Sequence, residues 1–413
     1  MSFRTLLLRP LLAGLIAAAS PSVLAQSATD LPQPNLPTPT PTPAQMPIPP
    51  APAAAGTAWL LMDHASGRIL AGHNIDQPLH PASLTKIMTA YVLAAEMSAG
   101  RVTADDEVLI SENAWRSGGA GTDGSFSALA VGSRVKLSDI EMGLVVQSGN
   151  DAAIAIAEHL AGSEEAFAGL MNSYAQKLGL SNSHFVNAHG LTAEGHLMSA
   201  RDIATLSRAL IRDYPEHYAL SKVKEYTYSG IRQYNRNGLL WKDDSVDGIK
   251  TGHTSAAGYC LAASAERDGQ RLISVVMGME GSRNEGFRRR EEGNLALLNW
   301  GFRHFETHTL YAANAELSAP RLWKGEIGNL PLGVAAPVIA TIPRGRYGEL
   351  VASMDLPPQL AAPVAKGQQV GRLRVKLGDE TVVDEPLIAL AEGAEAGFLK
   401  RSWDGLLMWW ESD

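Results

Sequence analysis

The chain reads Pro81-Ala82-Ser83-Leu84-Thr85-Lys86-Ile87-Met88-Thr89 at the start of a segment with helical periodicity. A helix is predicted from Ser83 to Glu96, with apolar side chains on one face at Ile87, Tyr91 and Ala94. Ser83 and Lys86 would therefore lie one turn apart on the same face, beside the positive end of the helix dipole. A capping serine followed by a solvated lysine is the alternative to a nucleophile with its base.

Two other Ser-x-x-Lys copies, Ser133–Lys136 and Ser221–Lys224, lie in charged, strand-like or irregular sequence. A solvated surface is the simpler interpretation of both, so the motif alone does not identify a site. A lysine acts as a base only if it can lose its proton, and burial and a second nearby cation both favour the neutral amine. The copy at Ser83 therefore predicts a second positive group elsewhere in the chain.

That second group is predicted at Lys250, in the only Lys-Thr-Gly sequence of the chain, which continues as His253-Thr254. Its glycine would let a substrate backbone approach closely. A third element, Ser148-Gly149-Asn150, lies between two apolar helical stretches. It offers a hydroxyl for proton relay and an amide that can hold a carbonyl or a lysine. Each triplet is common by itself, whereas the three in this order form a specific combination.

This combination resembles the serine penicillin-recognising enzymes, whose Ser-x-x-Lys, Ser-x-Asn and Lys-Thr-Gly signatures follow the same order. The likeness is strongest to the low-molecular-mass penicillin-binding proteins that are D-alanyl-D-alanine carboxypeptidases, and it extends from about Gly56 to the C-terminus. It is also carried by Tyr234-Asn235-Arg236-Asn237-Gly238-Leu239-Leu240-Trp241, by Gly248-Ile249 and by Asn299-Trp300-Gly301-Phe302-Arg303. The proline-rich spacer and residues 118–124 depart from the family pattern.

The resemblance implies a role for each motif residue. Ser83 would attack the carbonyl between two terminal D-alanines, and Lys86 would take its proton. Ser148 and Lys250 would carry a proton to the leaving D-alanine, while Asn150 would orient Lys86 and the substrate amide. Water would then hydrolyse the acyl-enzyme.

The same resemblance implies the substrate-binding residues. The backbone amides of Ser83 and His253 would form the oxyanion hole. The substrate carboxylate needs cationic or hydroxyl partners, and the candidates by position are Thr251, Thr254, Arg236 and Arg290. Gly252 and His253 of the same motif complete the expected substrate-binding residues. Neither a cofactor nor a metal ion is expected.

Strands are predicted at both ends of the motif-bearing region, and helices between them. The strands lie at 57–62, 69–71, 259–266 and 271–279, and the helices at 139–147, 151–160, 166–178 and 200–211. A last helix runs from about Glu291 to His304. This order predicts one α+β domain over 56–306 whose terminal segments share a sheet. The resemblance makes it the catalytic domain, with the antiparallel sheet and helical region of the penicillin-binding and β-lactamase-like transpeptidase fold.

Beyond Thr307 short strands are separated by proline and glycine, as in Val370 to Leu377 and Thr381-Val382-Val383. This texture predicts a small, sandwich-like antiparallel β domain over 307–395. No internal repeat relates it to the first domain.

The N-terminal segments lie outside both domains. Residues 1–25 are predicted to be a secretory signal peptide, because Arg4 and Arg9 flank an apolar run that is too short to span a bilayer. Residues 26–55 are predicted to be a proline-rich linker: ten of the 23 prolines lie within residues 31–55, which contain no charged residue. Such a segment is an extended spacer, since proline fixes φ and lacks an amide donor.

The tail, residues 396–413, is predicted to be an amphipathic membrane-anchor helix. Apolar side chains fall on one half of the helical wheel, at Phe398, Leu399, Trp403, Leu406, Leu407 and Trp410. Charged side chains fall on the other half, at Lys400, Arg401, Asp404 and Glu411. Three tryptophans suit a membrane–water interface, and the resembled family uses such a tail as an anchor. A helix packed on the β domain is the alternative.

Composition excludes several other classes. The 413 residues carry a formal charge of −8, which argues against general nucleic-acid binding. The single cysteine, Cys260, excludes an internal disulfide framework and a cysteine-based metal site, and it is expected to be a buried small hydrophobe. His184, His189 and His196 invite a zinc peptidase, but His-Glu-x-x-His is absent and their glycine-rich setting is that of a loop.

The expected function is a serine-type D-Ala-D-Ala carboxypeptidase acting on peptidoglycan stem pentapeptides and acylated by β-lactam antibiotics. The signal peptide and the tail place it on the periplasmic face of the bacterial inner membrane. Endopeptidase or β-lactamase-like activity of the same serine is the alternative, although a β-lactamase is not expected to carry the β domain and the tail. The complete motif set argues against an inactive penicillin-binding scaffold.

Overall fold

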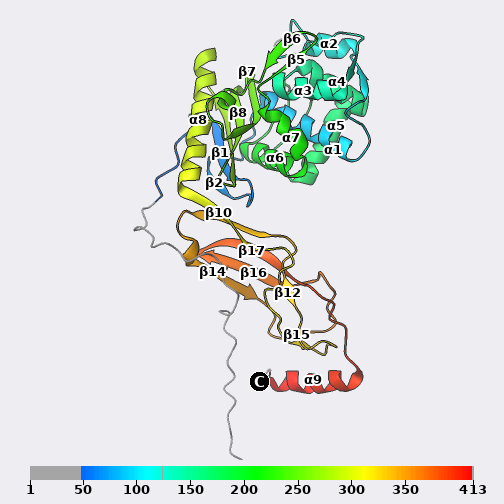
Figure 1. Cartoon of the computed structure of the whole chain (residues 1–413), viewed down its shortest axis with the longest axis vertical. Helices are drawn as coiled ribbons and strands as arrows, with labels where there is room; N and C mark the ends of the chain where they lie inside the picture. Colours follow the sequence, from blue (N-terminus) through cyan, green and yellow to red (C-terminus); the bar gives the residue numbers. More distant parts are fainter. Residues whose placement is uncertain (1–47, 123, 412–413) are drawn as a thin grey trace, which may run out of the picture.

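The computed structural model describes residues 48–122 and 124–411. The predicted signal peptide and most of the predicted linker therefore lie outside the described residues. Figure 1 shows an elongated molecule in which a mixed helix-and-sheet region is followed by a β region, with the C-terminal helix at the far end.

The segments on either side of the helical region form one antiparallel sheet. Its five strands have the order β2-β1-β9-β8-β7. They are β1 (Ala58–Asp63), β2 (Ile69–His73), β7 (Val246–Thr254), β8 (Gly258–Arg267) and β9 (Gln270–Met279). β1 pairs with β9, so that Ala58 lies opposite Met277 although more than two hundred residues separate them in the chain. The predicted α+β class and the shared sheet of the two terminal segments are confirmed.

Seven helices of the described chain lie to one side of this sheet (Figure 1). They are α1 (Lys86–Ser98), α2 (Glu112–Gly118), α3 (Leu137–Met142), α4 (Asn150–Ala161), α5 (Glu164–Leu178), α6 (Ala200–Asp213) and α7 (Pro215–Tyr218). Two small hairpins complete this side, β3 (Glu107–Leu109) with β4 (Arg134–Lys136) and β5 (Glu225–Tyr228) with β6 (Ile231–Tyr234).

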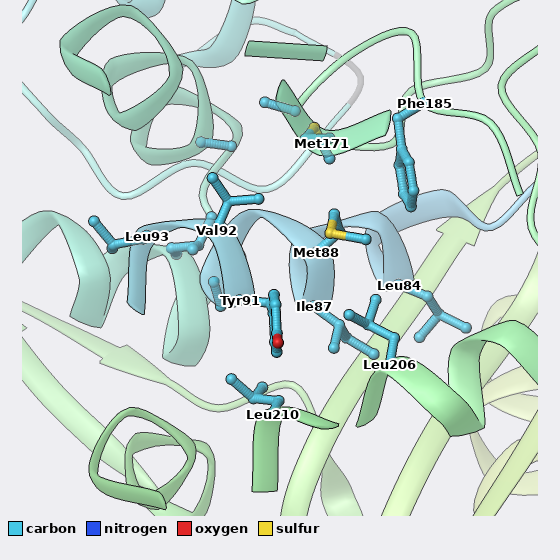
Figure 2. Packing of buried hydrophobic residues seen from close by; sticks show 14 of the residues in the cluster. Leu84, Ile87, Met88, Tyr91, Val92, Leu93, Met171, Phe185, Leu206 and Leu210 are labelled. Atoms are coloured by element: carbon cyan, nitrogen blue, oxygen red, sulfur yellow. The ribbon is translucent and has the colours of Figure 1, made fainter. Parts of the chain in front are cut away.

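Helix α1 is the centre of the main hydrophobic core. Every residue from Lys86 to Glu96 is buried, which is the pattern of a helix surrounded by protein. Figure 2 shows side chains of α1 between Met171 and Phe185 on one side and Leu206 and Leu210 of α6 on the other. The helix that begins with the lysine of the Ser-x-x-Lys motif is thus enclosed by protein on all sides.

The opposite face of the sheet is covered by α8 (Arg283–His304). This helix begins eight residues before the predicted start at Glu291. Its first two turns are polar and lack apolar periodicity, so the sequence pattern did not mark them. They are supported instead by the ion pair between Glu285 and Arg289 one turn apart.

Two motif segments also have a local structure that differs from the prediction. The Lys-Thr-Gly motif lies inside strand β7, where no strand was predicted, because Lys250 and its neighbours lack the apolar alternation of an ordinary strand. The helix predicted over 139–147 divides at Gly143 into α3 and a wider π-helical turn that ends at Gln147.

The C-terminal region contains a four-stranded sheet in the order β12-β17-β16-β14. Its strands are β12 (Leu332–Gly333), β14 (Leu350–Asp355), β16 (Gln369–Leu377) and β17 (Glu380–Ala389). Two further pairs join β10 (Phe305–Tyr311) with β13 (Val338–Pro343), and β11 (Leu322–Trp323) with β15 (Leu360–Ala361). The region has a hydrophobic core of its own, which confirms the predicted small all-β unit.

A polar cluster joins the two regions. The buried carboxylate of Asp63, at the end of β1, accepts a hydrogen bond of 2.6 Å from the Thr307 hydroxyl. Ser66 and Thr341 are in hydroxyl contact at 2.6 Å, and Arg68 donates to the Thr341 carbonyl at 2.7 Å. Because β10 also continues directly from α8, the connection between the regions is held by both chain and side chains.

The predicted C-terminal helix is present as α9 (Phe398–Glu411), and residues 412–413 of the predicted tail lie outside the described residues. Among the helices of the described chain, none combines the length and apolar character needed to cross a bilayer.

Candidate active site

The structure brings Ser83 and Lys86 together. The Lys86 amine lies 3.0 Å from the Ser83 hydroxyl oxygen, and the lysine side chain is almost fully buried at 1% exposure. Its amine also contacts the Asn150 side-chain oxygen at 2.7 Å and the His189 carbonyl at 2.8 Å. The two oxygen atoms of Asn150 and His189 therefore fix the direction in which the amine faces the Ser83 hydroxyl.

The backbone before Ser83 explains why the serine alone reaches the surface of the cavity. Ala82 has a left-handed φ of 49°, and a 3₁₀ turn from Ala82 to Thr85 precedes α1. This turn leaves Ser83 half-buried while its neighbours are buried. A Cβ atom at Gly190 would lie 1.9 Å from the Ala82 carbonyl oxygen, so the close approach of the two chains requires glycine there.

The Ser-Gly-Asn motif lies where the π-helical turn ends and α4 begins. Ser148 has a left-handed φ of 67°, which turns its side chain away from the helix path, and Asn150 is the first residue of α4. The Ser148 hydroxyl accepts a hydrogen bond of 2.8 Å from the Lys250 amine. The Asn150 amide nitrogen is buried and has no hydrogen-bond partner among the described residues. This nitrogen is thus a donor available to a bound molecule.

Strand β7 brings the Lys-Thr-Gly motif to the same place. The Lys250 amine also donates to the Thr251 carbonyl at 3.0 Å. A Cβ atom at Gly252 would lie 3.0 Å from the Pro81 carbonyl and 3.1 Å from the Ser83 amide nitrogen, so the strand edge passes close to the Ser83 turn. The amides proposed for the oxyanion hole therefore belong to adjacent segments. Next along the strand, the His253 ring stacks on Tyr259 with ring centres 4.1 Å apart.

Burial lowers the pKa of both lysines. The pKa of Lys86 falls to about 7, because desolvation outweighs the opposing attraction of the Asp151 and Glu164 carboxylates. The pKa of Lys250 is lowered well below its usual value by burial and then by the positive charges of Lys86 and nearby arginines. At neutral pH the two lysines are therefore not expected to be protonated at the same time. The Asp151 and Glu164 carboxylates lie near Lys86, so Lys86 is the lysine that carries the proton in the free protein.

The motif residues line one cavity of about 580 Å³. Ser83, Ser148, Asn150 and Thr251 contribute to its wall, as do Gly252, His253, Thr254, Arg236 and Arg290. Lys86 and Lys250 lie behind this wall and reach the cavity through the two serine hydroxyls. The predicted catalytic and substrate-binding residues thus converge on one place.

Of the two arginines among the substrate-binding candidates, Arg290 is buried at 3% exposure and Arg236 is exposed. Arg290 donates to the carbonyls of Gly252 at 3.3 Å and Cys260 at 3.4 Å, and to the Arg236 carbonyl at 3.4 Å. Its guanidinium also stacks over the Phe287 ring at 4.6 Å. These contacts support the backbone of β7 and β8 beside the cavity that Arg290 also lines. A direct contact of Arg290 with the substrate carboxylate stays a prediction.

Arg283 is a cavity residue that the sequence did not indicate. It is exposed at the start of α8 and lines the cavity together with Arg236. The pKa of Arg236 is lowered by desolvation and by the positive charge of Arg283. Neither guanidinium forms an ion pair within the described part of the chain. The first turn of α8 has no apolar periodicity that would mark Arg283 in the sequence. Its position beside Arg236 in the cavity wall is what identifies it as a candidate.

The segment between α2 and β4 forms another part of the wall that the sequence did not indicate. A Cβ atom at Gly124 would lie 2.3 Å from the Asn150 amide nitrogen, so the backbone passes directly over that side chain. The segment is tied down by the buried Asp151 carboxylate, which accepts from the amides of Ser127 at 2.8 Å and Leu129 at 3.1 Å. The position of Asp151 directly after the Ser-x-Asn motif is the one feature of the sequence that points to its contact with Ser127 and Leu129.

Glu164 and His189 hold the segment that faces Lys86. The Glu164 carboxylate contacts the His189 ring at 3.1 Å and accepts from the Ala188 amide at 3.1 Å. The adjacent carbonyls bind Lys86 at 2.8 Å and Thr89 at 2.6 Å. No motif marks Glu164 in the sequence.

The three histidines considered for zinc each bind protein atoms. His184 contacts the Gly195 carbonyl at 3.1 Å, and His196 contacts the Thr85 hydroxyl at 2.8 Å. Burial lowers the pKa of His196 to about 4, so its ring is neutral. Within the described residues no group of three or more histidine, cysteine or acidic side chains could hold a metal ion. Cys260 is fully buried, and burial raises the pKa of its thiol to about 11.

Comparison with known proteins agrees with this geometry. Residues 45–281 match the family model described as D-alanyl-D-alanine carboxypeptidase, and residues 305–395 match the model of the penicillin-binding protein 5 C-terminal domain. The chain belongs to the D-alanyl-D-alanine carboxypeptidase family. The resemblance inferred from the sequence motifs is confirmed.

Individual members of this family match over most of the chain. The D-alanyl-D-alanine carboxypeptidase DacC of Escherichia coli strain K12 is 46% identical over 354 residues, which are 85% of this chain and 87% of that protein. DacA of the same strain is 46% identical over 347 residues, covering 83% and 85%. Crystal structures of penicillin binding protein 5 from Haemophilus influenzae match with a TM-score of 0.80 and 40% identity, over 84% of this chain and 99% of that one.

Proposed function

We propose that this carboxypeptidase removes the terminal D-alanine from peptidoglycan stem pentapeptides through an acyl-enzyme on Ser83. The observation that carries the proposal is the 3.0 Å contact between the Ser83 hydroxyl and the Lys86 amine, whose pKa is lowered to about 7. Such an amine can be neutral at physiological pH and accept the hydroxyl proton.

In the first half of the reaction the Ser83 oxygen attacks the carbonyl of the penultimate D-alanine, and its proton moves to Lys86. The negative charge on the carbonyl oxygen is stabilised by the backbone amides of Ser83 and His253. Ser148 passes a proton from Lys250 to the nitrogen of the leaving D-alanine, and the C–N bond breaks. Asn150 orients Lys86 through its oxygen and binds the substrate amide through its nitrogen. Water then hydrolyses the ester, which releases the shortened peptide and restores Ser83.

The substrate carboxylate would also decide which lysine carries the proton. We propose that it binds near Thr251 and Thr254, within reach of Arg236 and Arg283. A negative charge there offsets the guanidinium charges that lower the pKa of Lys250. Binding would therefore move the balance towards protonated Lys250 and neutral Lys86, which is the arrangement that acylation needs.

Carboxypeptidase and endopeptidase substrates differ in the group that they present to these arginines. The two guanidiniums of Arg236 and Arg283 lack acidic partners within the described residues and favour a free terminal carboxylate. An internal peptide bond offers a neutral amide at that position. A β-lactam carries a comparable carboxylate and a reactive carbonyl, so we propose that β-lactam antibiotics acylate Ser83 as well. Endopeptidase or β-lactamase-like turnover by the same serine is the alternative.

We also propose the organisation and location predicted from the sequence: a cleaved signal peptide (1–25), a linker (26–55), a catalytic domain (56–306), a β domain (307–395) and an anchor helix (396–413). The chain would act on the periplasmic face of the inner membrane, with α9 on the membrane surface. This is supported by the exposure of the apolar side of α9, where Leu399 is 83% and Trp410 77% exposed.

The test of the reaction compares two serines that both lie in Ser-x-x-Lys sequences. Ser83→Ala should abolish covalent labelling by a fluorescent penicillin and the release of D-alanine from a pentapeptide. Ser133→Ala should change neither, because its hydroxyl donates to the Ala130 carbonyl away from the cavity. Labelling that survives in the Ser83→Ala protein would overturn the assignment.

A further inference from the structure

Helix α9 contacts the β region through its polar side. Asp404 is buried at 4% exposure, and its carboxylate accepts from the Lys324 amide at 2.8 Å and from the Arg321 guanidinium at 3.4 Å. The Lys400 amine donates to the Gly325 carbonyl at 2.5 Å, and Gln359 donates to the Met408 carbonyl at 3.0 Å. The polar side is therefore the inner side of this helix.

The apolar side of α9 faces away from the protein. Large side chains are more than half exposed along its whole length, at Phe398, Leu399, Trp403, Leu406, Trp409 and Trp410. An amphipathic helix that packs on its own domain buries its apolar face and exposes its charges. Here the arrangement is inverted at Asp404, which is the buried side chain of the helix. Figure 1 shows the helix lying across the end of the molecule farthest from the helix-and-sheet region.

This helix has little reason to be folded by itself. It is 14 residues long, and isolated helices of about that length are marginal in water. Gly405 in its interior lowers the intrinsic helix propensity further, by about 1 kcal/mol relative to alanine. Contacts with the β region must therefore supply the stability, and the hydrogen bonds of Asp404 are the ones made by a buried side chain of the helix.

We propose that Asp404 is a latch that keeps α9 folded on the β domain, so that its apolar face meets a lipid bilayer as a preformed, rigid surface. The inference rests on the proposed membrane role of α9 and goes beyond it. It states that the anchor is folded before it meets lipid, and that the membrane plane is fixed relative to the β domain. Preorganisation lowers the ordering cost of binding.

A bilayer is the occupant that fits this face best. Three tryptophans at the exposed positions are typical of the headgroup region, whereas Lys400 and Asp404 contact the β region from the other side of the helix. The segment that leads into the helix is also fixed, because the Ala396 amide donates to the Lys324 carbonyl at 2.8 Å. A second copy of the chain on the same face is treated as an outcome of the test.

The test uses the mature full-length protein and amide hydrogen exchange without lipid. In the unmodified protein the α9 amides should exchange much more slowly than in an unfolded peptide. Asp404→Ala should abolish this protection while leaving that of the β-domain strands intact. Glu411→Ala removes the same charge from an exposed position of the same helix and should retain it. Unprotected α9 amides in the unmodified protein would overturn the latch, whatever the protein does with membranes.

Vesicle binding gives the second readout. Asp404→Ala should weaken binding to phosphatidylcholine vesicles by about tenfold if the folded helix population falls to about a tenth. Adding Gly405→Ala in that background should recover part of the loss, because alanine favours the helix and its Cβ would make only an ordinary contact, 3.8 Å, with Lys324. Equal binding of the unmodified and Asp404→Ala proteins would contradict the latch.

The two proposals fail in different ways. If the protein does not bind vesicles although its α9 amides are protected from exchange, the membrane role is refuted, while the docking of the helix through Asp404 is not. Concentration-dependent self-association that buries the tryptophans without lipid would overturn the bilayer as the occupant.

Discussion

At the scale of single residues, the charge of Lys86 is set by two opposing effects. Burial lowers its pKa to about 7, while the Asp151 and Glu164 carboxylates raise it. A base must be neutral to accept a proton, so the rate of acylation by benzylpenicillin should rise with pH on a limb centred near 7. Lys86→Arg should abolish acylation, because a guanidinium does not give up its proton.

Glu164→Gln tests the origin of that limb. Removing a negative charge disfavours the protonated amine, so the limb should move to lower pH by roughly half a unit to one unit. The amide keeps an oxygen that can accept from the Ala188 amide. Glu165→Gln, an exposed neighbour in the same turn, should leave the pH profile unchanged. A shift to higher pH, or equal shifts in both variants, would show that Glu164 does not act through charge on Lys86.

A second prediction at this scale concerns Arg283. Its guanidinium lines the cavity beside Arg236, so Arg283→Ala should raise KM for a pentapeptide about three- to tenfold, as expected for loss of one exposed charge-assisted contact. The same variant should have little effect on a substrate whose terminal carboxylate is amidated. Arg288→Ala serves as the control, because that side chain pairs with Glu292 on the outer side of α8. Equal losses on both substrates would contradict a carboxylate-binding role.

At the scale of elements, the buried Asp151 connects α4 with the wall of the cavity. Asp151→Ala would leave the Ser127 and Leu129 amides buried without their acceptor and should lower the free energy of unfolding of the catalytic region by roughly 3 kcal/mol. The decrease in stability is measured by heating the protein and using the loss of penicillin labelling to monitor unfolding of the catalytic region. Asp139→Ala, an exposed carboxylate in the first turn of α3, should change stability by less than about 0.5 kcal/mol. Comparable losses in the two variants would contradict the role assigned to Asp151.

Helices and strands with a clear apolar periodicity were predictable from the sequence. Strand β7, which carries residues of the active site, was not. The helix of Ser83 and Lys86 was predicted because apolar residues follow it at helical spacing, and α4 to α6 were predicted for the same reason. Strand β7 was missed because it carries Lys250 and Gly252 where an ordinary strand would carry apolar residues. Its conformation is decided by pairing with β8 and by packing beside the cavity, which are tertiary contacts that a single sequence does not show.

The positions of candidate site residues show the same division. The three motifs identified residues that do converge on one cavity, since each motif has a specific combination of side chains. Arg290 was placed by analogy near the substrate carboxylate; it does line the cavity, but it is buried and binds the carbonyls of β7 and β8, so its contact with substrate stays a prediction. Arg283 and Glu164 were missed because each reaches the site by tertiary contact alone, and a single sequence carries no signal for such contacts.

At the scale of the whole molecule, the active site and the exposed apolar helix lie at opposite ends of an elongated chain (Figure 1). The β region between them has its own core, and the joint around Asp63 and Thr307 holds it against the catalytic sheet. Both regions were predicted from the sequence, because the pattern changes near Thr307 from helical periodicity to short strands separated by proline and glycine. The inverted packing of α9 was not predictable, because a helical wheel shows that a helix is amphipathic but not which of its faces packs against the protein.

The separation of the two ends leads to the last prediction. Deleting residues 398–413 removes no side chain of the cavity or of the β core, so the rate of penicillin acylation should stay within about twofold of the unmodified protein. Binding to phosphatidylcholine vesicles should be lost, and because the tail carries only two basic residues against three acidic ones, binding of the full chain should resist added salt. Replacing Trp403, Trp409 and Trp410 together by serine keeps the chain length and the latch residue, and should also abolish binding. A truncated protein that still sediments with vesicles would place the membrane contact elsewhere, and a truncated protein that no longer reacts with penicillin would mean that the tail supports the catalytic region at a distance.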